Sequence, residues 1–436
     1  MRLIRTQGRA AKKAAELLAR LENRGGSSLD TVLPAVRKII RKVREEGDKA
    51  LLRFAQKFDG LEGKSSAALR VGPEETAAAW QQLDPTLKQA LETAAANIRA
   101  FAERQLPQSW NLAPTYPEGG GLITGQLVRT LDSVGCYVPG GRHPLPSTML
   151  MTVIPAQVAG VGRIVVTSPR PAPETLATAH LLGVTEFYRI GGAHAVAALA
   201  SGVEAIPRVA KIVGPGNLYV TAAKREVAFD CAIDMLAGPT EIVVTSDFGD
   251  PAFIASDLVA QAEHDPEALA IFITTNQTLA LQVIEETKQR SRHNIIAKQA
   301  LGRNGYVFLA ADAEQAQAIT NRLAPEHLTV DSEADLAWVR NAGSVFIGKH
   351  SPQPMGDYIS GPNHTLPTGG TATVRGGLSV NDFVKLITVQ QYTADGLAEL
   401  GSHAIRLAEA EGLIGHAEAI RSRMQTPAKT SKGAKA

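Results

Sequence analysis

The stretch Glu241-Ile-Val-Val-Thr245, together with a helical segment after it and Leu269-Ala-Ile-Phe-Ile-Thr274 beyond, decides the fold class of this chain. Both runs are short and aliphatic, which is typical of strands that are buried on both faces. Between them, Asp250 can cap a helix, Pro251 suits its first position, and Asp265-Pro266 ends it. A strand, a helix and a second buried strand in this order predict parallel α/β sheet.

The same alternation of short aliphatic strands and helices begins near residue 131. Strands are expected at 163–168, 186–190, 209–213, 241–245, 269–274 and 306–309, and helices at 173–182, 193–201, 217–227, 276–290 and 312–323. The blocks 131–235 and 240–348 share this rhythm, which favours two related α/β domains, but no sequence repeat connects them. The first hundred residues have mainly helical spacing, and a helical C-terminal arm is expected near 381–389, 394–411 and 415–424.

Length and composition restrict the class of protein. A chain of 436 residues is long enough for two or three domains, and its formal net charge of +2 argues against nucleic acid or a membrane surface as the main partner. No apolar run approaches the length of a bilayer span. Cys136 and Cys231 have no C-x-x-C spacing, so we expect buried free thiols in a reducing, cytoplasmic compartment.

Four scattered side chains form a candidate metal-ligand set. Gln261 and His264 stand three apart near the end of the helix that Asp250 begins, so their side chains lie on one side of it. Asp357 in a glycine-flanked loop and His416 in the C-terminal arm complete a nitrogen and oxygen set that suits zinc. The alternative is a polar helix end that meets solvent, and sequence spacing alone leaves both interpretations open.

The dipeptide Glu326-His327 is a candidate acid–base pair. Pro325 ends the preceding helix and an apolar strand follows at 328–330, so the dipeptide is expected on a turn. Histidine titrates near neutral pH and glutamate can activate a water, so adjacent residues of these two types can handle protons. The alternative is a surface dipeptide without a catalytic role.

Glycine-rich turns stand at Gly140-Gly141, where the α/β block begins, and after two of the expected strands, at Gly191-Gly192 and Gly214-Pro-Gly216-Asn217. Glycine allows a ligand to approach the backbone closely, and a helix that starts there favours phosphate. No G-x-G-x-x-G follows any expected strand, so the standard dinucleotide fingerprint is absent. The turns indicate a nucleotide-sized ligand or, alternatively, simple strand-to-helix connections.

Taken together, these stretches resemble the histidinol dehydrogenase family, to about residue 424. The most specific matches occur in the family's order, at 135–141, 211–217, 233–241, 257–264, 323–328 and 356–368. The resemblance implies oxidation of L-histidinol to L-histidine through the aldehyde with two NAD+, in the last steps of histidine biosynthesis. It also implies two Rossmann-like parallel-sheet domains in an intertwined homodimer, with one zinc ion per subunit and an active site shared between subunits.

The resemblance implies a domain organisation as well. We expect an N-terminal helix over 1–27, a zinc and catalytic domain made of 28–130 and 237–380, and an NAD-binding domain over 131–236. A helical arm over 381–424 would contact the partner subunit, and 425–436 would form a disordered tail.

Residue roles carry over by motif. Gln261, His264 and Asp357 resemble the zinc ligands of one subunit, with His416 supplied by the partner. Glu326 and His327 resemble the acid–base pair. Substrate contacts are expected from the zinc ligands and His327, and further from Thr240, His364 and Glu411, while NAD contacts are expected from Tyr137, His194 and Asn217.

Two positions depart from the family's pattern. His194 stands where the family has a glutamine in Gly-Gly-Ala-Gln, and Thr240 stands where serine is common. The hydroxyl group survives at Thr240, so we expect little change there. The replacement at His194 puts that contact with the cofactor in question.

Three competing interpretations remain at this level. A related zinc- and NAD-dependent enzyme could oxidise another small diol, such as a sulfonated propanediol, but the Glu411 carboxylate favours a cationic substrate. A zinc hydrolase is disfavoured by the glycine turns and the absence of H-E-x-x-H. A non-catalytic metal-binding or nucleic-acid-interacting protein is disfavoured by the nearly neutral charge.

Overall fold

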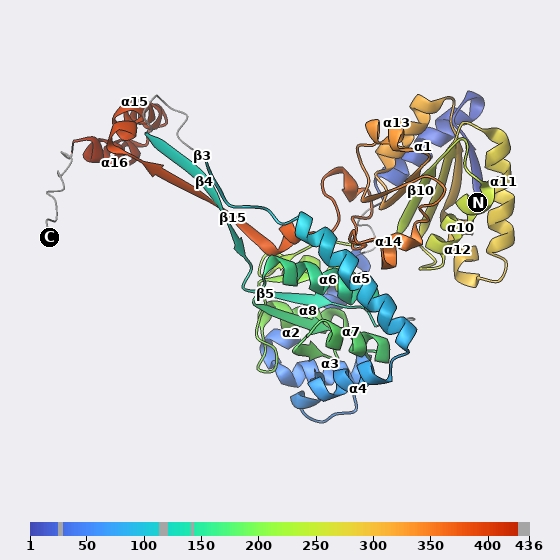
Figure 1. Cartoon of the computed structure of the whole chain (residues 1–436), viewed down its shortest axis with the longest axis horizontal. Helices are drawn as coiled ribbons and strands as arrows, with labels where there is room; N and C mark the ends of the chain where they lie inside the picture. The colour runs from blue at the N-terminus through green and yellow to red at the C-terminus, as the bar shows by residue number, and fades with distance from the viewer. Residues whose placement is uncertain (25–28, 113–120, 141–143, 426–436) are drawn as a thin grey trace. The chain divides into compact units, whose positions relative to one another are not determined.

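The computed structural model describes residues 1–24, 29–112, 121–140 and 144–425 (Figure 1). The chain divides into two compact units: Met1–Leu106 with Leu131–Phe383, and Pro107–Thr130 with Val384–Ala436. Gly141 of the first glycine turn and nearly all of the expected tail over 425–436 lie outside the described residues.

One six-stranded sheet of the first unit is parallel throughout. Its order is β1 (Arg2–Arg5), β12 (Gly305–Leu309), β11 (Leu269–Thr274), β10 (Glu241–Thr245), β13 (His327–Val330) and β14 (Ser344–Ile347). Helices α10 (Pro251–Ala262), α11 (Gln277–Arg290) and α12 (Ile295–Asn304) cover one face, and α1 (Ala11–Glu22) and α13 (Ala313–Leu323) cover the other. Ile242 and Val244 of β10 face the first layer and Val243 faces the second, so both faces are apolar.

The second sheet of this unit repeats the strand order. It runs β2 (Arg70–Val71), β7 (Glu186–Tyr188), β6 (Arg163–Thr167), β5 (Ser133–Tyr137), β8 (Lys211–Val213) and β9 (Ala232–Ile233), with only β2 antiparallel. In each sheet the first strand of the block lies between two later strands. Strand β5 lies between β6 and β8, and β10 lies between β11 and β13. The six strands predicted from the sequence are confirmed, and the shared order gives the two blocks one topology.

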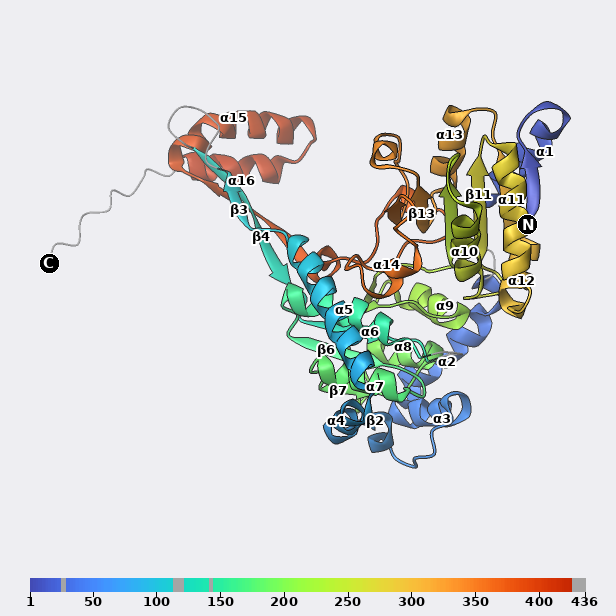
Figure 2. The same ribbon diagram turned by 45° about the vertical axis from the view of Figure 1, so that its right-hand side comes forward.

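The helices between residues 29 and 104 pack on this second sheet. Helices α2 (Leu33–Glu46) and α3 (Asp48–Asp59) join α8 (Gly192–Ser201) and α9 (Leu218–Val227) in one apolar cluster. Helices α4 (Pro73–Gln82) and α5 (Pro85–Arg104) lie against α7 (Pro173–Leu181) and α6 (Pro146–Ala159) (Figures 1 and 2). This differs from the expected grouping of 28–130 with 237–380. An amphipathic stripe such as that of Val36, Ile40 and Val43 requires burial but does not say against which sheet.

The second unit contains a three-stranded antiparallel sheet and a helical hairpin. The strands are β3 (Trp110–Leu112), β4 (Leu122–Thr130) and β15 (Val384–Tyr392), and the helices α15 (Ala394–Ala410) and α16 (Ile414–Met424) pack side by side (Figure 2). The helix expected near 381–389 is therefore wrong. The segment is rich in β-branched and aromatic residues, and it pairs along its whole length with β4. Gly412, just after α15, has a positive φ of 74°, a backbone conformation in which glycine commonly ends a helix.

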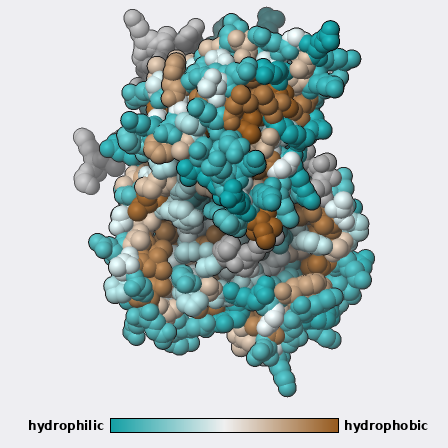
Figure 3. Space-filling view, turned by 90° about the vertical axis from the view of Figure 1, so that its right-hand side faces the viewer, coloured by the Kyte–Doolittle hydropathy of each residue, from teal (hydrophilic) through white to brown (hydrophobic). Residues whose placement is uncertain are grey.

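Burial of the two thiols agrees with the sequence. Cys136 and Cys231 are both free and buried, and burial raises the pKa of Cys136 to about 12 and that of Cys231 to about 11. Among the described residues, none of the helices combines the length and apolarity needed to cross a membrane. On the face shown in Figure 3, hydrophilic residues predominate and hydrophobic ones lie in separate patches.

Candidate active site

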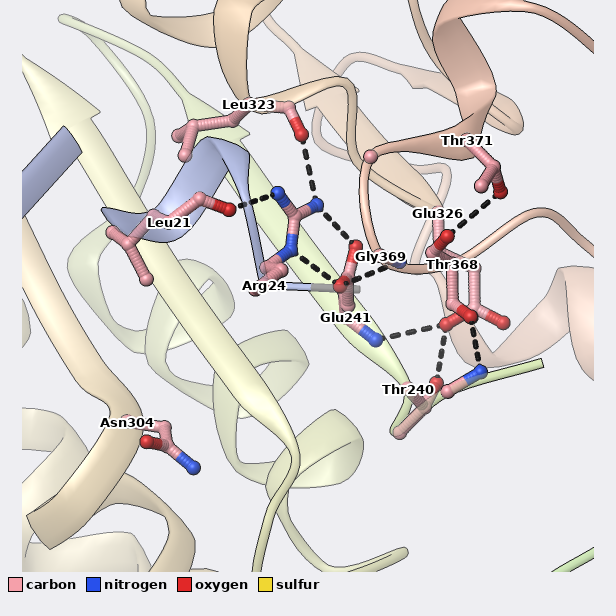
Figure 4. Close-up of polar contacts among 12 residues, drawn as sticks. Leu21, Arg24, Thr240, Glu241, Asn304, Leu323, Glu326, Thr368, Gly369 and Thr371 are labelled. Atoms are coloured by element: carbon pink, nitrogen blue, oxygen red, sulfur yellow. Dashed lines mark hydrogen bonds and ion pairs between the residues drawn. The ribbon is translucent and has the colours of Figure 1, made fainter. Parts of the chain in front are cut away.

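The Glu326 carboxylate lies at the amino edge of the first sheet. Strands β10 and β13 are neighbours, so the residues that precede them meet at this edge. The Thr240 hydroxyl donates to Glu326 Oε2 at 2.5 Å, and the Glu241 backbone N–H donates to the same oxygen at 2.8 Å (Figure 4). Because Oε2 accepts both bonds, Glu326 has a fixed orientation and its Oε1 is left for other chemistry.

The imidazole of His327 is buried beside two carboxylates. Its Nδ1 lies 3.1 Å from the Glu241 carbonyl oxygen, which can only accept, so this contact assigns the proton to Nδ1. Its Nε2 lies 3.7 Å from Asp357 Oδ1. Burial alone would lower the pKa of His327, but the charges of Glu326 and Asp357 outweigh it and raise that pKa to about 10.

Gln261 and Asp357 each lie beside His327, and the exposed His264 lies near Asp357. Gln261 ends the buried face of α10, and its amide Nε2 donates to the Thr240 hydroxyl. Asp357 lies in the short helix α14 (Pro354–Tyr358), where the charge of His264 contributes to lowering its pKa. Burial alone would raise the pKa of Asp357, but hydrogen bonding and charge from His327, with smaller contributions from His364 and His264, hold it below its usual value.

These three side chains fit a divalent metal ion. Gln261 is 1% exposed, and its Oε1 is buried without a hydrogen-bond partner. A buried oxygen of this kind is costly unless a donor or a cation satisfies it. With the imidazole of His264 and the carboxylate of Asp357 it forms a nitrogen and oxygen set suited to zinc. Within the described parts of the chain, no three His, Cys, Asp or Glu side chains form a metal-holding group, so the amide oxygen of Gln261 is needed in this set.

His364 borders a cavity that also reaches His327. The ring Nδ1 of His364 lies 2.9 Å from the Asp357 carbonyl oxygen, and its Nε2 lies 3.3 Å from the Thr148 hydroxyl. Burial lowers the pKa of His364 below its usual range. The cavity has a volume of about 280 Å³ and includes Phe346 and Asn363 in its lining. It therefore offers space for a small molecule beside His327.

Two predicted site residues belong to the second unit. Glu411 follows α15 and His416 lies in the first turn of α16, and both side chains are exposed within that unit. The other predicted metal, acid–base and substrate residues all belong to the first unit: Thr240, Gln261, His264, Glu326, His327, Asp357 and His364.

Tyr137 and Asn217 lie at the carboxyl edge of the second sheet. Tyr137 ends β5 and Asn217 follows β8, and these two strands are neighbours at the point where the strand order reverses. Open α/β sheets bind ligands outside this edge at such a point. The exposed Asn217 side chain caps α9 by accepting from the N–H groups of Tyr219 and Val220.

His194 is turned toward the interior. Its ring is 1% exposed, and its Nε2 lies 2.7 Å from Asp59 Oδ2, which also accepts the Gly191 N–H at 3.0 Å. The next N–H, from Gly192, donates to the Tyr137 hydroxyl at 3.1 Å. His194 thus has almost no surface for a direct cofactor contact, and it supports the glycine turn instead.

The sequence did not single out Arg24, Asp59, Glu241 or Gln353. Gln353 donates to Asp357 Oδ2 at 3.0 Å, and Arg24 pairs with Glu241 beside Glu326. A charged residue at the head of the apolar run 241–245 was a signal that could have found Glu241. Arg24 offers no such signal, because its partner lies 217 positions away.

Known proteins place the chain in one family. The sequence model of the histidinol dehydrogenase family matches residues 22–424. The histidinol dehydrogenase of Bacillus cereus is 46% identical over 407 residues, which cover 91% of this chain and 93% of that relative. The one from Methanothermobacter thermautotrophicus is 46% identical over 422 residues, which cover 94% and 97%. A crystal structure of histidinol dehydrogenase from Elizabethkingia anophelis matches with a TM-score of 0.90 at 34% identity and covers 98% of both chains.

Proposed function

We propose the chemistry of this site on one premise: this chain belongs to the histidinol dehydrogenase family. It is an NAD-dependent oxidoreductase of histidine biosynthesis. The substrate is L-histidinol, and the product is L-histidine. The alcohol loses one hydride to NAD+ to give the aldehyde, and the hydrated aldehyde loses a second hydride to another NAD+.

A zinc ion held by Gln261 Oε1, His264 and Asp357, with His416 of the partner subunit, is the second part of the proposal. The buried Gln261 oxygen, which has no hydrogen-bond partner, is the observation that carries it. When bound, zinc supplies a Lewis acid that orients the amino alcohol and polarises its oxygen. A cation bound to Asp357 would offset one of the two charges that raise the pKa of His327. The pKa of His327 would then lie closer to neutral pH.

The homodimer is supported by apolar surface on the second unit. Among the described residues, its exposed large apolar side chains are Trp110, Leu112, Leu386, Ile387, Tyr392, Leu407, Leu413, Ile414 and Met424. Gathered on so small a unit, such side chains are typical of a protein interface. A second copy of the chain would cover them, and the same association would deliver His416 and Glu411 to the partner's site.

Proton transfer is assigned to Glu326 and His327. In the first oxidation, His327 takes the hydroxyl proton on Nε2, since Nδ1 already carries one, and the charge of Glu326 stabilises the imidazolium. In the second oxidation, Glu326 takes a proton from the water that attacks the aldehyde. Thr240 and the Glu241 N–H hold Oε2, so Oε1 is the oxygen that receives it.

Specificity is assigned to cation recognition. The Glu411 carboxylate of the partner would pair with a positively charged group of histidinol, and His364 would contact the substrate from the cavity that it borders. A sulfonated diol lacks a cation for Glu411 and would be repelled by it. This difference separates histidinol from the substrate of the competing diol dehydrogenase.

Metal depletion tests the proposed function directly. After chelation and dialysis, we expect NADH formation from histidinol and NAD+ to fall about 10³-fold and to return when zinc is added. A sulfonated propanediol should give no NADH before or after depletion. Full activity in the metal-free protein, or turnover of the diol in preference to histidinol, would contradict the proposal.

NAD binding is assigned to the second, Rossmann-like sheet, with the exposed Asn217 at its reversal point and the buried Tyr137 and His194 supporting the glycine turn. Replacing Asn217 by Ala removes a helix cap and a cofactor contact, so we expect the KM for NAD+ to rise about tenfold and stability to fall by about 1 kcal/mol. Asn276→Ala is the matched control, because Asn276 is an equally exposed cap, of α11, on the other sheet. It should lose similar stability with an unchanged KM. Equal KM values in both variants would argue against the assignment.

A further inference from the structure

We propose that Arg24 is a positioning residue, which holds the carboxylate of Glu326 in place from outside the catalytic cavity. The proposal rests on the function given above only in taking Glu326 as a catalytic group. Arg24 follows α1, and it is absent from the lining of the cavity that contains His327. It acts through two neighbours of Glu326, the side chain of Glu241 and the carbonyl of Leu323.

The first connection is a buried, two-pronged ion pair. Arg24 Nε lies 2.5 Å from Glu241 Oε1, and Arg24 Nη2 lies 2.6 Å from Glu241 Oε2 (Figure 4). The two side chains are 13% and 4% exposed. A guanidinium that meets a carboxylate in this way fixes both the distance and the plane of the carboxylate. Arg24 therefore determines where the head of β10 lies.

The second connection reaches the chain just before Glu326. Arg24 Nη2 also donates to the Leu323 carbonyl at 2.8 Å, and Arg24 Nη1 donates to the Leu21 carbonyl at 2.6 Å. Leu323 ends α13, and Ala324 after it has a positive φ of 45°, which is strained for a residue with a side chain. The bond to Leu323 anchors the start of this tight turn, and Glu326 is the third residue after Leu323.

Glu241 passes the restraint on to the reacting carboxylate. Its backbone N–H donates to Glu326 Oε2 at 2.8 Å, and its side chain accepts the Gly369 N–H at 2.9 Å. The side chain and the main chain of one residue thus connect Arg24, Glu326 and the loop that contains Gly369 (Figure 4). Displacing the Glu241 side chain would shift the N–H that orients Glu326.

The positive charge of Arg24 also stabilises two buried carboxylates. Glu241 and Glu326 are 3% and 7% exposed, so two carboxylates are buried side by side. Burial raises the pKa of Glu241, the nearby charge of Glu326 raises it further, and the contacts with Arg24 oppose both. Without the guanidinium, Glu241 would be an uncompensated buried charge that pushes against Glu326.

Arg24→Met and Arg24→Lys test the proposal in the full-length, zinc-loaded enzyme. We expect Arg24→Met to slow the step that depends on Glu326 about 10²-fold, because a small misplacement of a reacting group has that effect. Arg24→Lys keeps the charge without the fork and should lie between. Arg322→Met is the matched control: Arg322 of α13 forms a two-pronged pair with Glu22 of α1, and so joins α1 to α13 as the Arg24–Leu323 bond does, but its partner is Glu22 and not Glu241. It should leave the rate unchanged.

A double-mutant cycle with Glu326→Gln separates positioning from general stability. If Arg24 acts through Glu326, Arg24→Met should slow the Glu326→Gln enzyme by less than about threefold, whichever oxidation Glu326 serves. Additive losses in the double variant, or an unchanged rate in Arg24→Lys and Arg24→Met, would overturn the proposal. If Arg24→Met does not fold, Arg24→Lys takes its place in the cycle. The proposed function fails separately, when Glu326→Gln itself has no effect on turnover.

Discussion

Replacing Glu326 by Gln should slow oxidation of the aldehyde about 10³-fold and oxidation of the alcohol by less than about tenfold. The glutamine oxygen can still accept from the Thr240 hydroxyl and the Glu241 N–H, so the local structure should survive. The amide cannot take a proton from water, and only the second oxidation needs that transfer. NADH formation measured from histidinol and from the aldehyde, supplied separately, gives the two rates.

The control for this experiment is a glutamate with strong partners but no place in the site. Glu226→Gln removes the charge of a carboxylate in α9 that accepts two bonds from Arg37 in α2. We expect both oxidation rates to stay unchanged in that variant. Equal losses of the two rates in Glu326→Gln would mean that one base serves both oxidations, and the division of labour with His327 would then be wrong.

Much of the first unit follows from local patterns. Strands β10 and β11 were predictable because a strand that is buried on both faces must be apolar throughout, as Ile242, Val243 and Val244 are. Strand β1 was not predictable in the same way. It has four residues with an arginine at each end, and its partner β12 lies about 300 positions away. A short edge strand carries too little local pattern to reveal such a pairing.

The site was predictable residue by residue but not as an arrangement. Helical spacing predicted a shared side for Gln261 and His264, whereas α10 ends at Ala262, Gln261 is buried and His264 is exposed. Nothing in the spacing placed either residue near Asp357. The glycine turns drew attention to the carboxyl edge of the strands, whereas Glu326 and His327 lie at the amino edge of the first sheet. Their approach to Thr240 depends on the pairing of β10 with β13, which is a tertiary contact.

Supporting residues are the hardest to find in a sequence. Arg24 and Glu241 are 217 positions apart, and Asp59 and His194 are 135 apart. Each pair is visible only once two distant segments are packed together. His194 was expected to contact the cofactor because it stands where the family has a glutamine, but its ring points to Asp59, whose carboxylate also accepts the Gly191 N–H. The residue type alone did not give the direction of the side chain.

A mixture of two inactive variants should recover activity if His416 is supplied by the partner subunit. We expect His416→Ala and His327→Asn each to have less than about 1% of the normal rate, because one lacks a metal ligand and the other lacks the base. Co-expression gives mixed dimers in about half of the molecules, and one of the two sites in each has a complete set of residues. The expected activity is therefore about a quarter of the unmodified enzyme.

The matched control pairs two defects that belong to the same subunit's site. Gln261→Ala and His327→Asn leave His416 intact in both chains, so every site of a mixed dimer keeps one of the two defects and no recovery is expected. Recovery with His416→Ala but not with Gln261→Ala would locate the fourth ligand on the neighbouring chain. Absence of recovery in both mixtures, with mixed dimers verified by two affinity tags, would mean that each site is built from a single chain. The exposed apolar residues of the second unit would then need a different explanation, since they would no longer accompany an exchange of ligands.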